Sequence, residues 1–303
     1  MRLPCGYSVL AGLLLALVGS TPALAQGRGL KLYISADMEG VVGVVTGDQL
    51  GPSGFEYGRF REFMTQEVLA AIRAALAAGV QEILVSDSHG NGENLLLEKL
   101  PNDVLVVRSW PRPLMMMQGI DSTFDAVILL GYHAGTTNPE GVRAHTISSG
   151  RLADIRLNGR SVPEAGISAA IAGHFGVPVI MISGGDAAVA EAQALLGDIE
   201  GAVVKWNYSF HSAKTRTPQA AYDLIEQKVA RALRRLDDFK PFVLSTPVTL
   251  DVRFKNYRPS QLLAYLPIVE RTDAHSIRYV GGDMIAIAKF VEFMMSYNAG
   301  LEP

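Results

Sequence analysis

The sequence predicts an α/β fold, with a mostly parallel sheet covered by helices and a second, smaller α/β unit near the C-terminus. Short apolar segments alternate along the chain with longer segments in which apolar residues recur every three to four positions. Of the 303 residues, 49% are hydrophobic and 19% are charged, which is enough apolar material for a large core. We expect one unit over 26–214 and the smaller unit over 215–303.

The composition also excludes several classes of protein. The high apolar fraction and the net charge of -3 exclude a disordered chain. A single cysteine cannot form an internal disulfide. The charge balance is slightly acidic and shows no long cluster of lysine and arginine, so we expect no nucleic-acid partner.

The first 25 residues differ from the rest of the chain. Arg2 supplies a short positive segment, an apolar run follows over 9–18, and Ala23-Leu24-Ala25 has the small-x-small pattern of a cleavage site. These features predict a signal peptide over 1–25, with an uncleaved anchor as the alternative. The apolar run is shorter than the roughly 20 residues that span a bilayer. We therefore expect an exported protein, periplasmic or secreted, without stable membrane insertion after cleavage.

The larger unit begins with a strand and a long helix. The apolar segment from Leu30 to Ala36 predicts the strand, and apolar residues at helical spacing predict a helix from Arg59 to Ala78 that Gly79 ends. The methionines at 115–117 are interpreted as core filling, with a soft binding surface as the alternative. Three further apolar segments predict strands, the last two of them buried, at 82–86, 103–107 and 125–131.

The rest of the larger unit continues the alternation. The segment 145–157 alternates loosely, and Asn158-Gly159 predicts a hairpin turn. Pro163 suits the first turn of a helix over 163–175 that Gly176 closes. The remaining elements are a strand at 177–183, a helix at 187–196 and a strand at 202–206.

The pattern changes after Thr217-Pro218, where the smaller unit begins. A long helix over 219–237 comes first. The elements after it are a strand at 241–253, a short helix at 260–266, a strand near 276–280 and a final helix at 282–297.

Polar side chains of metal-binding types follow three of the predicted strands. Asp37 and Glu39 follow the first strand, Asp87 and His89 follow the second, and His133 follows a later buried strand. Ligands of open α/β sheets bind at the carboxyl ends of the strands. If these strands are parallel and adjacent, their side chains converge on one site.

The chemistry of this set favours a metal site without sulfur. The spacings Asp-x-Glu and Asp-x-His place both members of each pair on one side of an extended chain. Carboxylates and imidazoles suit zinc or manganese in hydrolytic sites, and Cys5, the sole cysteine, lies in the predicted leader. Such a set can hold two metals about 3.5–4 Å apart, which polarise a carbonyl and lower the pKa of a bound water to roughly 7. For each residue taken singly, a capping or surface role is the alternative.

Four segments together resemble the D-aminopeptidase family, peptidase family M55, first labelled a dipeptide transport protein. They read SADMEG (35–40), SDSHGNGENLLLEKL (86–100), LLGYHAG (129–135) and NGRSVPEAGISAAIAGHFGVPVIMISGGD (158–186). The resemblance covers about 30 to 300. It implies a zinc-dependent aminopeptidase that acts on short peptides with an N-terminal D-residue, such as D-Ala-D-Ala.

The resemblance also implies roles for six residues. It makes His145 the catalytic nucleophile or base. Asp37 would bridge two zinc ions, with Glu39 and His133 on one ion and His89 and Glu164 on the other. Without the resemblance, Glu164 reads as a first-turn carboxylate favoured by the helix dipole.

Further expectations concern partners and competing functions. The resemblance implies a ring-like homo-oligomer such as a decamer. An exported dipeptide-binding protein for uptake and a two-metal amidase or esterase are the alternatives, and the sequence does not fix D or L stereospecificity. Asp87 is either a carboxylate that orients a ligating histidine or a turn residue. Four other polar residues are interpreted as ordinary caps or surface residues: His174, Asp186, His211 and His275.

Overall fold

The structure, a computed structural model, describes Met1 and residues 29–297. Apart from Met1, the predicted signal peptide over 1–25 lies outside the described residues. Within the described part of the chain, no helix combines the length and the hydropathy needed to cross a bilayer.

The larger sheet has seven strands, and every neighbouring pair is parallel except the last. The predicted mostly parallel sheet is therefore confirmed. Its central strands are buried along most of their length, which explains why they read as continuous apolar runs. Across the sheet the order is β3 (Leu105–Val107), β2 (Val80–Asp87), β1 (Leu30–Ala36), β4 (Ala126–Tyr132), β7 (Val179–Gly185), β8 (Glu200–Ser209) and β9 (Ser212–Thr215).

Helices cover both faces of this sheet. Helix α1 (Tyr57–Ala77) packs against α4 (Pro218–Arg234), and α2 (Glu164–His174) packs against α3 (Asp186–Leu196). The units β1-α1-β2 and β7-α3-β8 run in opposite directions across the sheet. Since such crossovers are right-handed, α1 and α3 lie on opposite faces.

The smaller sheet has five antiparallel strands. Asn158 and Gly159 adopt positive φ values of 47° and 82° between its strands β5 (Leu152–Leu157) and β6 (Arg160–Ser161), as the hairpin signal predicts. Two helices accompany this sheet, α5 (Tyr257–Leu263) and α6 (Met284–Ser296). The order is β11 (Val269–Arg271), β12 (Ser276–Gly281), β10 (Val248–Phe254), β5 (Leu152–Leu157) and β6 (Arg160–Ser161).

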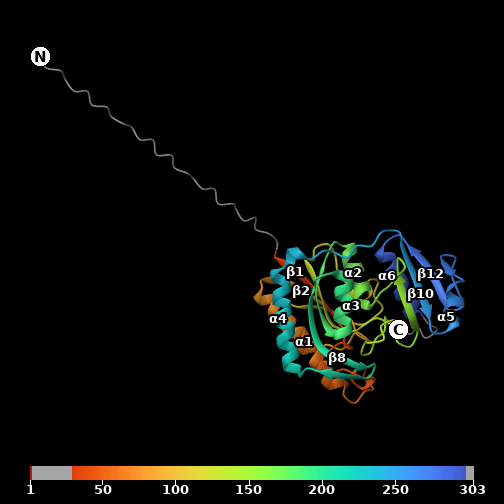
Figure 1. Cartoon of the computed structure of the whole chain (residues 1–303), viewed down its shortest axis with the longest axis horizontal. Helices are drawn as coiled ribbons and strands as arrows, with labels where there is room; N and C mark the ends of the chain where they lie inside the picture. The colour runs from red at the N-terminus through yellow and green to blue at the C-terminus, as the bar shows by residue number, and fades with distance from the viewer. Residues whose placement is uncertain (2–28, 298–303) are drawn as a thin grey trace.

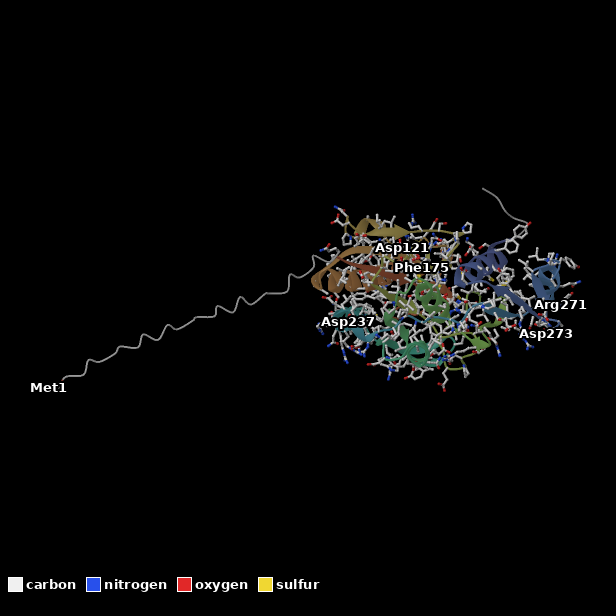
Figure 2. All side chains as sticks on the ribbon, turned by 90° about the horizontal axis from the view of Figure 1, so that it is seen from above. Met1, Asp121, Phe175, Asp237, Arg271 and Asp273 are labelled. Carbon is white, nitrogen blue, oxygen red and sulfur yellow. The ribbon has the colours of Figure 1, made fainter. Side chains whose placement is uncertain are left out.

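The two sheets lie toward opposite ends of the molecule. In Figure 1, α1 and α4 cover one end, and β10, β12 and α5 form the other, with α2, α3 and α6 between them. The view from above in Figure 2 places Asp121 and Asp237 toward the first end and Arg271 and Asp273 at the second. The expected boundary at 215 does not coincide with a division between the sheets, because β5 and β6 precede it and α4 packs on α1 of the larger sheet.

Several predicted strands differ from the observed ones. Strand β3 lies at an edge rather than in the core, and Leu105 is 71% exposed. The segments 145–151 and 241–247 are irregular, so β5 and β10 begin later than predicted. Strands β9 and β11 were not predicted, because β9 has four mostly polar residues and β11 has three residues, and segments this short show no periodicity. Four short 3-10 turns complete the part of the chain over 29–297: Gly47–Gln49, Leu97–Lys99, Met115–Met117 and Leu236–Asp238.

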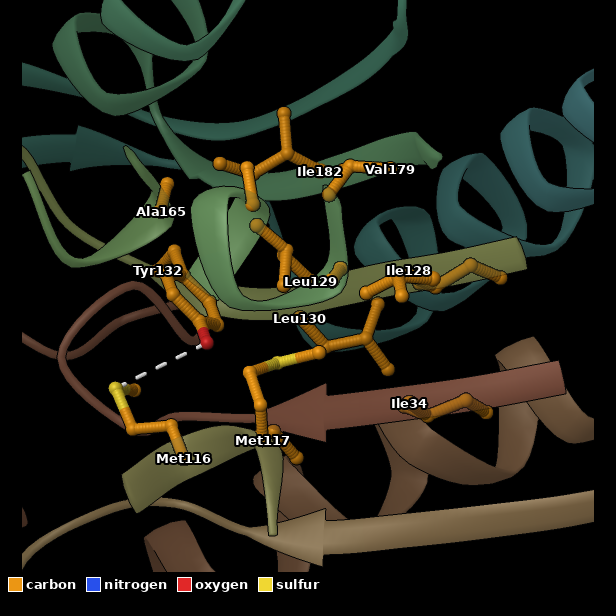
Figure 3. Close-up of a cluster of buried hydrophobic side chains, with 14 of the residues drawn as sticks. Ile34, Met116, Met117, Ile128, Leu129, Leu130, Tyr132, Ala165, Val179 and Ile182 are labelled. Carbon is orange, nitrogen blue, oxygen red and sulfur yellow. Dashed lines mark hydrogen bonds between the residues drawn. The ribbon is translucent and has the colours of Figure 1, made fainter. Parts of the chain in front are cut away.

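A dense apolar cluster lies between β1, β4, β7 and α2. Ile34, Ile128 and Leu130 are fully or almost fully buried, and Figure 3 shows Met117 beside Leu130 and Met116 beside Tyr132. The Tyr132 hydroxyl lies 4.0 Å from the Met116 sulfur, the contact dashed in Figure 3. Core filling by these methionines is thus confirmed, although Met115 and Met116 also line a cavity beside the strand ends.

Candidate metal centre

Three parallel neighbouring strands bring polar residues to one edge of the larger sheet. Strand β1 lies between β2 and β4, and Ala36 at its end is paired with Asp87 of β2 and Leu130 of β4. Asp37 and Glu39 follow β1, His89 follows β2, and His133 follows β4. The expected convergence at the carboxyl edge therefore occurs, and the four side chains are buried.

Glycines allow the loop after β1 to approach β4 closely. A Cβ atom on Gly40 would lie 2.0 Å from Tyr132 O, and one on Gly131 would lie 2.2 Å from Asp37 O. Gly131 also has a φ of 67°, which L side chains rarely adopt. Each glycine belongs to a segment that also carries site residues, so the backbone contact between these segments fixes where Asp37 and His133 point.

Asp37 lies between two histidines. Its Oδ1 is 3.3 Å from His89 Nδ1, and its Oδ2 is 3.3 Å from His133 Nε2. His89 Nδ1 is also 2.8 Å from Glu39 Oε2. One oxygen of Asp37 thus faces each histidine, which is the arrangement a bridging carboxylate needs.

Glu164 and His145 complete the cluster from outside the strand ends. Glu164 begins α2, and its Oε2 lies 3.3 Å from His133 Nε2. His145 comes from the loop between β4 and β5, and its Nε2 lies 3.7 Å from Glu164 Oε1 and 3.9 Å from Glu39 Oε1. The His133 and His145 rings stack with centroids 3.9 Å apart. All six residues to which the family resemblance assigns a role therefore lie together in one cluster.

A backbone carbonyl fixes the orientation of each imidazole. His89 Nε2 donates to Leu50 O at 2.7 Å, His133 Nδ1 to Ala134 O at 3.0 Å, and His145 Nδ1 to Arg143 O at 2.8 Å. A carbonyl only accepts, so in the neutral form the other nitrogen of each ring presents a lone pair to the carboxylates. Lone pairs that face carboxylates repel unless a proton or a metal ion lies between them. Metal-ligating histidines are held in this way in proteins.

The pKa values show how strongly the cluster attracts positive charge. Burial opposes the charged form of His133, but Glu164 and Asp37 outweigh it and raise its pKa to about 10. Burial likewise opposes charging of His89, and Glu39 and Asp37 raise its pKa well above 6.5. Burial, reinforced by Glu39, raises the pKa of Asp37 above its usual 3.8. Protons thus compensate the carboxylates when no metal ion does so.

Two buried atoms at the centre lack hydrogen-bond partners among the described residues. They are Asp37 Oδ2 and His133 Nε2, which face each other. Such orphaned atoms are rare inside proteins, and an ion between them would satisfy both. Two overlapping groups each have ligand atoms within 4.8 Å of one another. The first group is His133, His145 and Glu164, and the second is Asp37, Glu39 and His133. The donor set of oxygen and nitrogen fits zinc.

The shortest contacts differ from the expected division between two ions. His89 Nδ1 lies 2.8 Å from Glu39 and His133 Nε2 lies 3.3 Å from Glu164, whereas the family resemblance implies one ion held by Glu39 and His133 and another held by His89 and Glu164. The ligand atoms of Asp37, Glu39 and His133 also lie within 4.8 Å of one another, so these three residues of the expected division do come together.

His145 differs electrostatically from the other two histidines. Burial, together with the neighbouring His133, lowers its pKa below 6.5. Its side chain keeps 12% exposure and lines the cavity. A neutral imidazole whose Nε2 faces a cavity can accept a proton.

Other candidate residues have structural roles. Asp87 accepts hydrogen bonds from the Asn94 and Leu95 backbone at 2.6 and 2.8 Å, so it organises the loop that carries His89 rather than its imidazole. Asp186 begins α3 and accepts from Asn207 N. The remaining three histidines lie outside the metal-binding groups of the described residues: His174, His211 and His275.

Two parts of the site were missed from the sequence. A cavity of about 360 Å³ adjoins the cluster, and Trp110 and three α6 residues, Glu292, Met295 and Ser296, line it. Lys205 is buried under the loop after β1 and donates to the carbonyls of Glu39, Val41 and Val44. A lysine inside the apolar segment AVVKW was the available signal for Lys205, whereas nothing local marks α6.

Comparisons with known proteins agree with this geometry. A family model described as D-aminopeptidase, peptidase family M55, matches residues 30–293. The D-aminopeptidase of Bacillus subtilis strain 168 is 34% identical over 257 residues, covering 84% of this chain and 93% of that protein. A solved structure, the Zn-dependent D-aminopeptidase DppA from Bacillus subtilis, described as a self-compartmentalizing protease, superposes with a TM-score of 0.84 at 32% identity. That match covers 89% of this chain and 99% of the other.

Proposed function

This chain belongs to the D-aminopeptidase family, peptidase family M55, and from this premise we propose that it is a zinc-dependent aminopeptidase that hydrolyses short peptides beginning with a D-amino acid. D-Ala-D-Ala represents the substrate type. The observation that carries the proposal is the cluster of three carboxylates and three carbonyl-oriented imidazoles, buried except for the partly exposed His145, beside a cavity of about 360 Å³.

The donor set supports two zinc ions per subunit. Asp37 would bridge them, Glu39 and His89 would hold one, and His133 and Glu164 would hold the other, as the shortest contacts group these residues. Bound zinc supplies Lewis-acid polarisation of the peptide carbonyl and stabilises the negative charge that develops on its oxygen.

His145 supplies the proton acceptor or the nucleophile. Its Nδ1 hydrogen is committed to Arg143 O, so Nε2 is the acceptor that faces the cavity. The lowered pKa keeps this imidazole neutral near pH 7, ready to take a proton from an attacking water. Apolar side chains of Met115, Met116 and Ile147 line the cavity and limit the access of other water.

Assembly and location are further parts of the proposal. The relative described as a self-compartmentalizing protease supports a ring-like homo-oligomer such as a decamer, with the cavities facing an interior channel. The predicted signal peptide over 1–25 supports export, with substrates drawn from the periplasm or the exterior.

Matched dipeptides test the proposed function. Zinc-loaded protein should release D-Ala from D-Ala-D-Ala, lose this activity with a chelator and regain it on adding zinc, while L-Ala-L-Ala reacts poorly. Tight dipeptide binding without bound zinc or hydrolysis would instead indicate the exported binding protein. Equal hydrolysis of both dipeptides would contradict the D-specificity.

A further inference from the structure

Helix α6 forms a wall of the cavity that is separate from the metal cluster. Glu292, Met295 and Ser296 line it from the second half of this helix. Beyond the six cluster residues, Glu292 is the one charged side chain among the described residues that line the cavity. The other side chains there are apolar or carry a hydroxyl group, and they include Trp110 and Met116.

Glu292 has no cationic partner within ion-pair distance in the described part of the chain. Its Oε1 accepts a hydrogen bond from Ser296 Oγ at 2.6 Å. The nearby Arg112 guanidinium is committed to Ser86 Oγ at 2.9 Å and Asp87 O at 2.7 Å, so it acts on Glu292 only at longer range. Arg151 instead donates to the Met295 carbonyl at 2.8 Å, which secures the last turn of α6.

The position of Glu292 is unfavourable for an unpaired carboxylate. The C-terminal part of a helix carries partial negative charge, and the last turn of α6 holds no basic residue to offset it. The residue is also half-buried beside apolar side chains, where an unpaired charge loses hydration. A positively charged ligand group would relieve both costs.

We propose that Glu292 selects peptides that carry a cationic side chain, such as that of D-lysine, in addition to the α-ammonium group. This inference rests on the proposed function and names a substrate class for the same site. The cavity volume falls within the range of small-ligand sites, which spans roughly 300 to 1,000 Å³.

Geometry assigns Glu292 to a side chain rather than to the α-ammonium group. The α-nitrogen and the scissile carbonyl carbon are bonded to the same Cα, so they lie only about 2.5 Å apart. A carbonyl held at the metal cluster therefore keeps the α-ammonium group beside Asp37, Glu39 and Glu164. In the described part of the chain, Glu292 is hydrogen-bonded to Ser296 of its own helix and to none of the six cluster residues. Because Glu292 and the cluster line the same cavity, the four-carbon stem of lysine would carry its ammonium group away from the cluster and toward the α6 wall.

The test compares kcat/KM for D-Lys-D-Ala and D-Ala-D-Lys with D-Ala-D-Ala and with the matching D-Glu dipeptides. We expect the wild-type protein to prefer a lysine peptide over its glutamate counterpart by at least about tenfold. E292Q should lower this ratio about tenfold, and E292K should invert it. E98Q is the control, because Glu98 is an exposed carboxylate away from the cavity. Equal zinc content across the variants shows that the cluster stays intact.

Three results would overturn the proposal. A wild-type protein that hydrolyses D-Ala-D-Ala without any charge preference leaves the proposed function standing and removes the role of Glu292. An equal fall in kcat/KM for all peptides with E292Q means that Glu292 binds the α-ammonium group or supports the fold. No hydrolysis of any D-peptide by the zinc-loaded protein removes both the proposed function and this inference.

Discussion

Replacing Lys205 by methionine should disturb the loop that carries Asp37 and Glu39. The Lys205 side chain lies 1% exposed beneath this loop. Its ammonium group donates to Glu39 O, to Val41 O at 3.1 Å and to Val44 O at 2.7 Å. Methionine preserves the length of the side chain but supplies no donor, so K205M removes all three hydrogen bonds at once.

The size of the effect follows from the groups left behind. Val41 O keeps a hydrogen bond from Val44 N, so mainly the Glu39 and Val44 carbonyls lose a partner. Each unsatisfied buried carbonyl costs about 1–3 kcal/mol. Removal of a buried ammonium group recovers part of this cost. We therefore expect K205M to lower the free energy of unfolding by about 3 kcal/mol, and kcat/KM to fall because Glu39 is no longer held in place.

Urea unfolding and dipeptide hydrolysis measure the two effects. K228M is the matched control, since Lys228 forms a partly exposed ion pair with Glu200 and its loss should cost at most about 1 kcal/mol. If the free energy of unfolding of K205M lies within about 1 kcal/mol of the wild-type value and the variant hydrolyses dipeptides normally, the loop does not depend on Lys205 and the reasoning is refuted.

Three other changes test separate parts of the account. H145A should lower kcat by roughly 10²–10⁴-fold while the protein retains two zinc ions by elemental analysis, and normal turnover would remove the assigned role. Zinc binding at pH 7 should release protons, because Asp37, His89 and His133 have raised pKa values and must lose their protons to bind the metal. Zinc affinity should therefore rise with pH, and calorimetry in buffers of different ionisation enthalpy should show the release, whereas no proton release would contradict the assignment. Burial raises the pKa of Glu67 from 4.5 to about 7, so the folded state binds more protons than the unfolded state between these pH values, and the free energy of unfolding should fall as the pH rises from 4.5 to 7. Urea unfolding at both pH values should show a fall of up to about 3 kcal/mol in the wild type and a smaller fall in E67Q. An equal fall in E67Q would refute this role of Glu67.

Strand ends were the most predictable part of the site. Asp37, Glu39, His89 and His133 stand directly after apolar segments, and parallel neighbours must bring such residues together. Their convergence follows from local periodicity and one topological rule. The same reasoning predicts β1 with its observed limits, because a buried strand has a clear apolar boundary at both ends.

Residues that reach the site from distant elements were not predictable from local pattern. Glu164 reads locally as a first-turn carboxylate and His145 as the start of a hairpin, so only the family resemblance marked them. Glu292 lies on a helix of the smaller sheet, and its place in the cavity depends on how α6 packs against α2 and the Met115–Met117 turn. Such packing depends on the whole fold rather than on any short segment.

The smaller sheet shows the same limit at the level of the fold. Its strands β5 and β10 pair across about a hundred residues of intervening chain, with Leu250 opposite Leu157. A division of the chain at 215 could not anticipate that pairing, because no change in composition marks the point where the chain leaves the larger sheet to form β5 of the smaller one.

Anomalous diffraction at the zinc edge tests the central claim most directly. Crystals of the zinc-loaded protein should show two zinc peaks per chain, each coordinated by a different oxygen of Asp37, with Glu39 and His89 at one and His133 and Glu164 at the other. Zinc–ligand distances should be about 2.0–2.2 Å. No zinc at this cluster, or zinc bound at another place in the chain, would contradict the account.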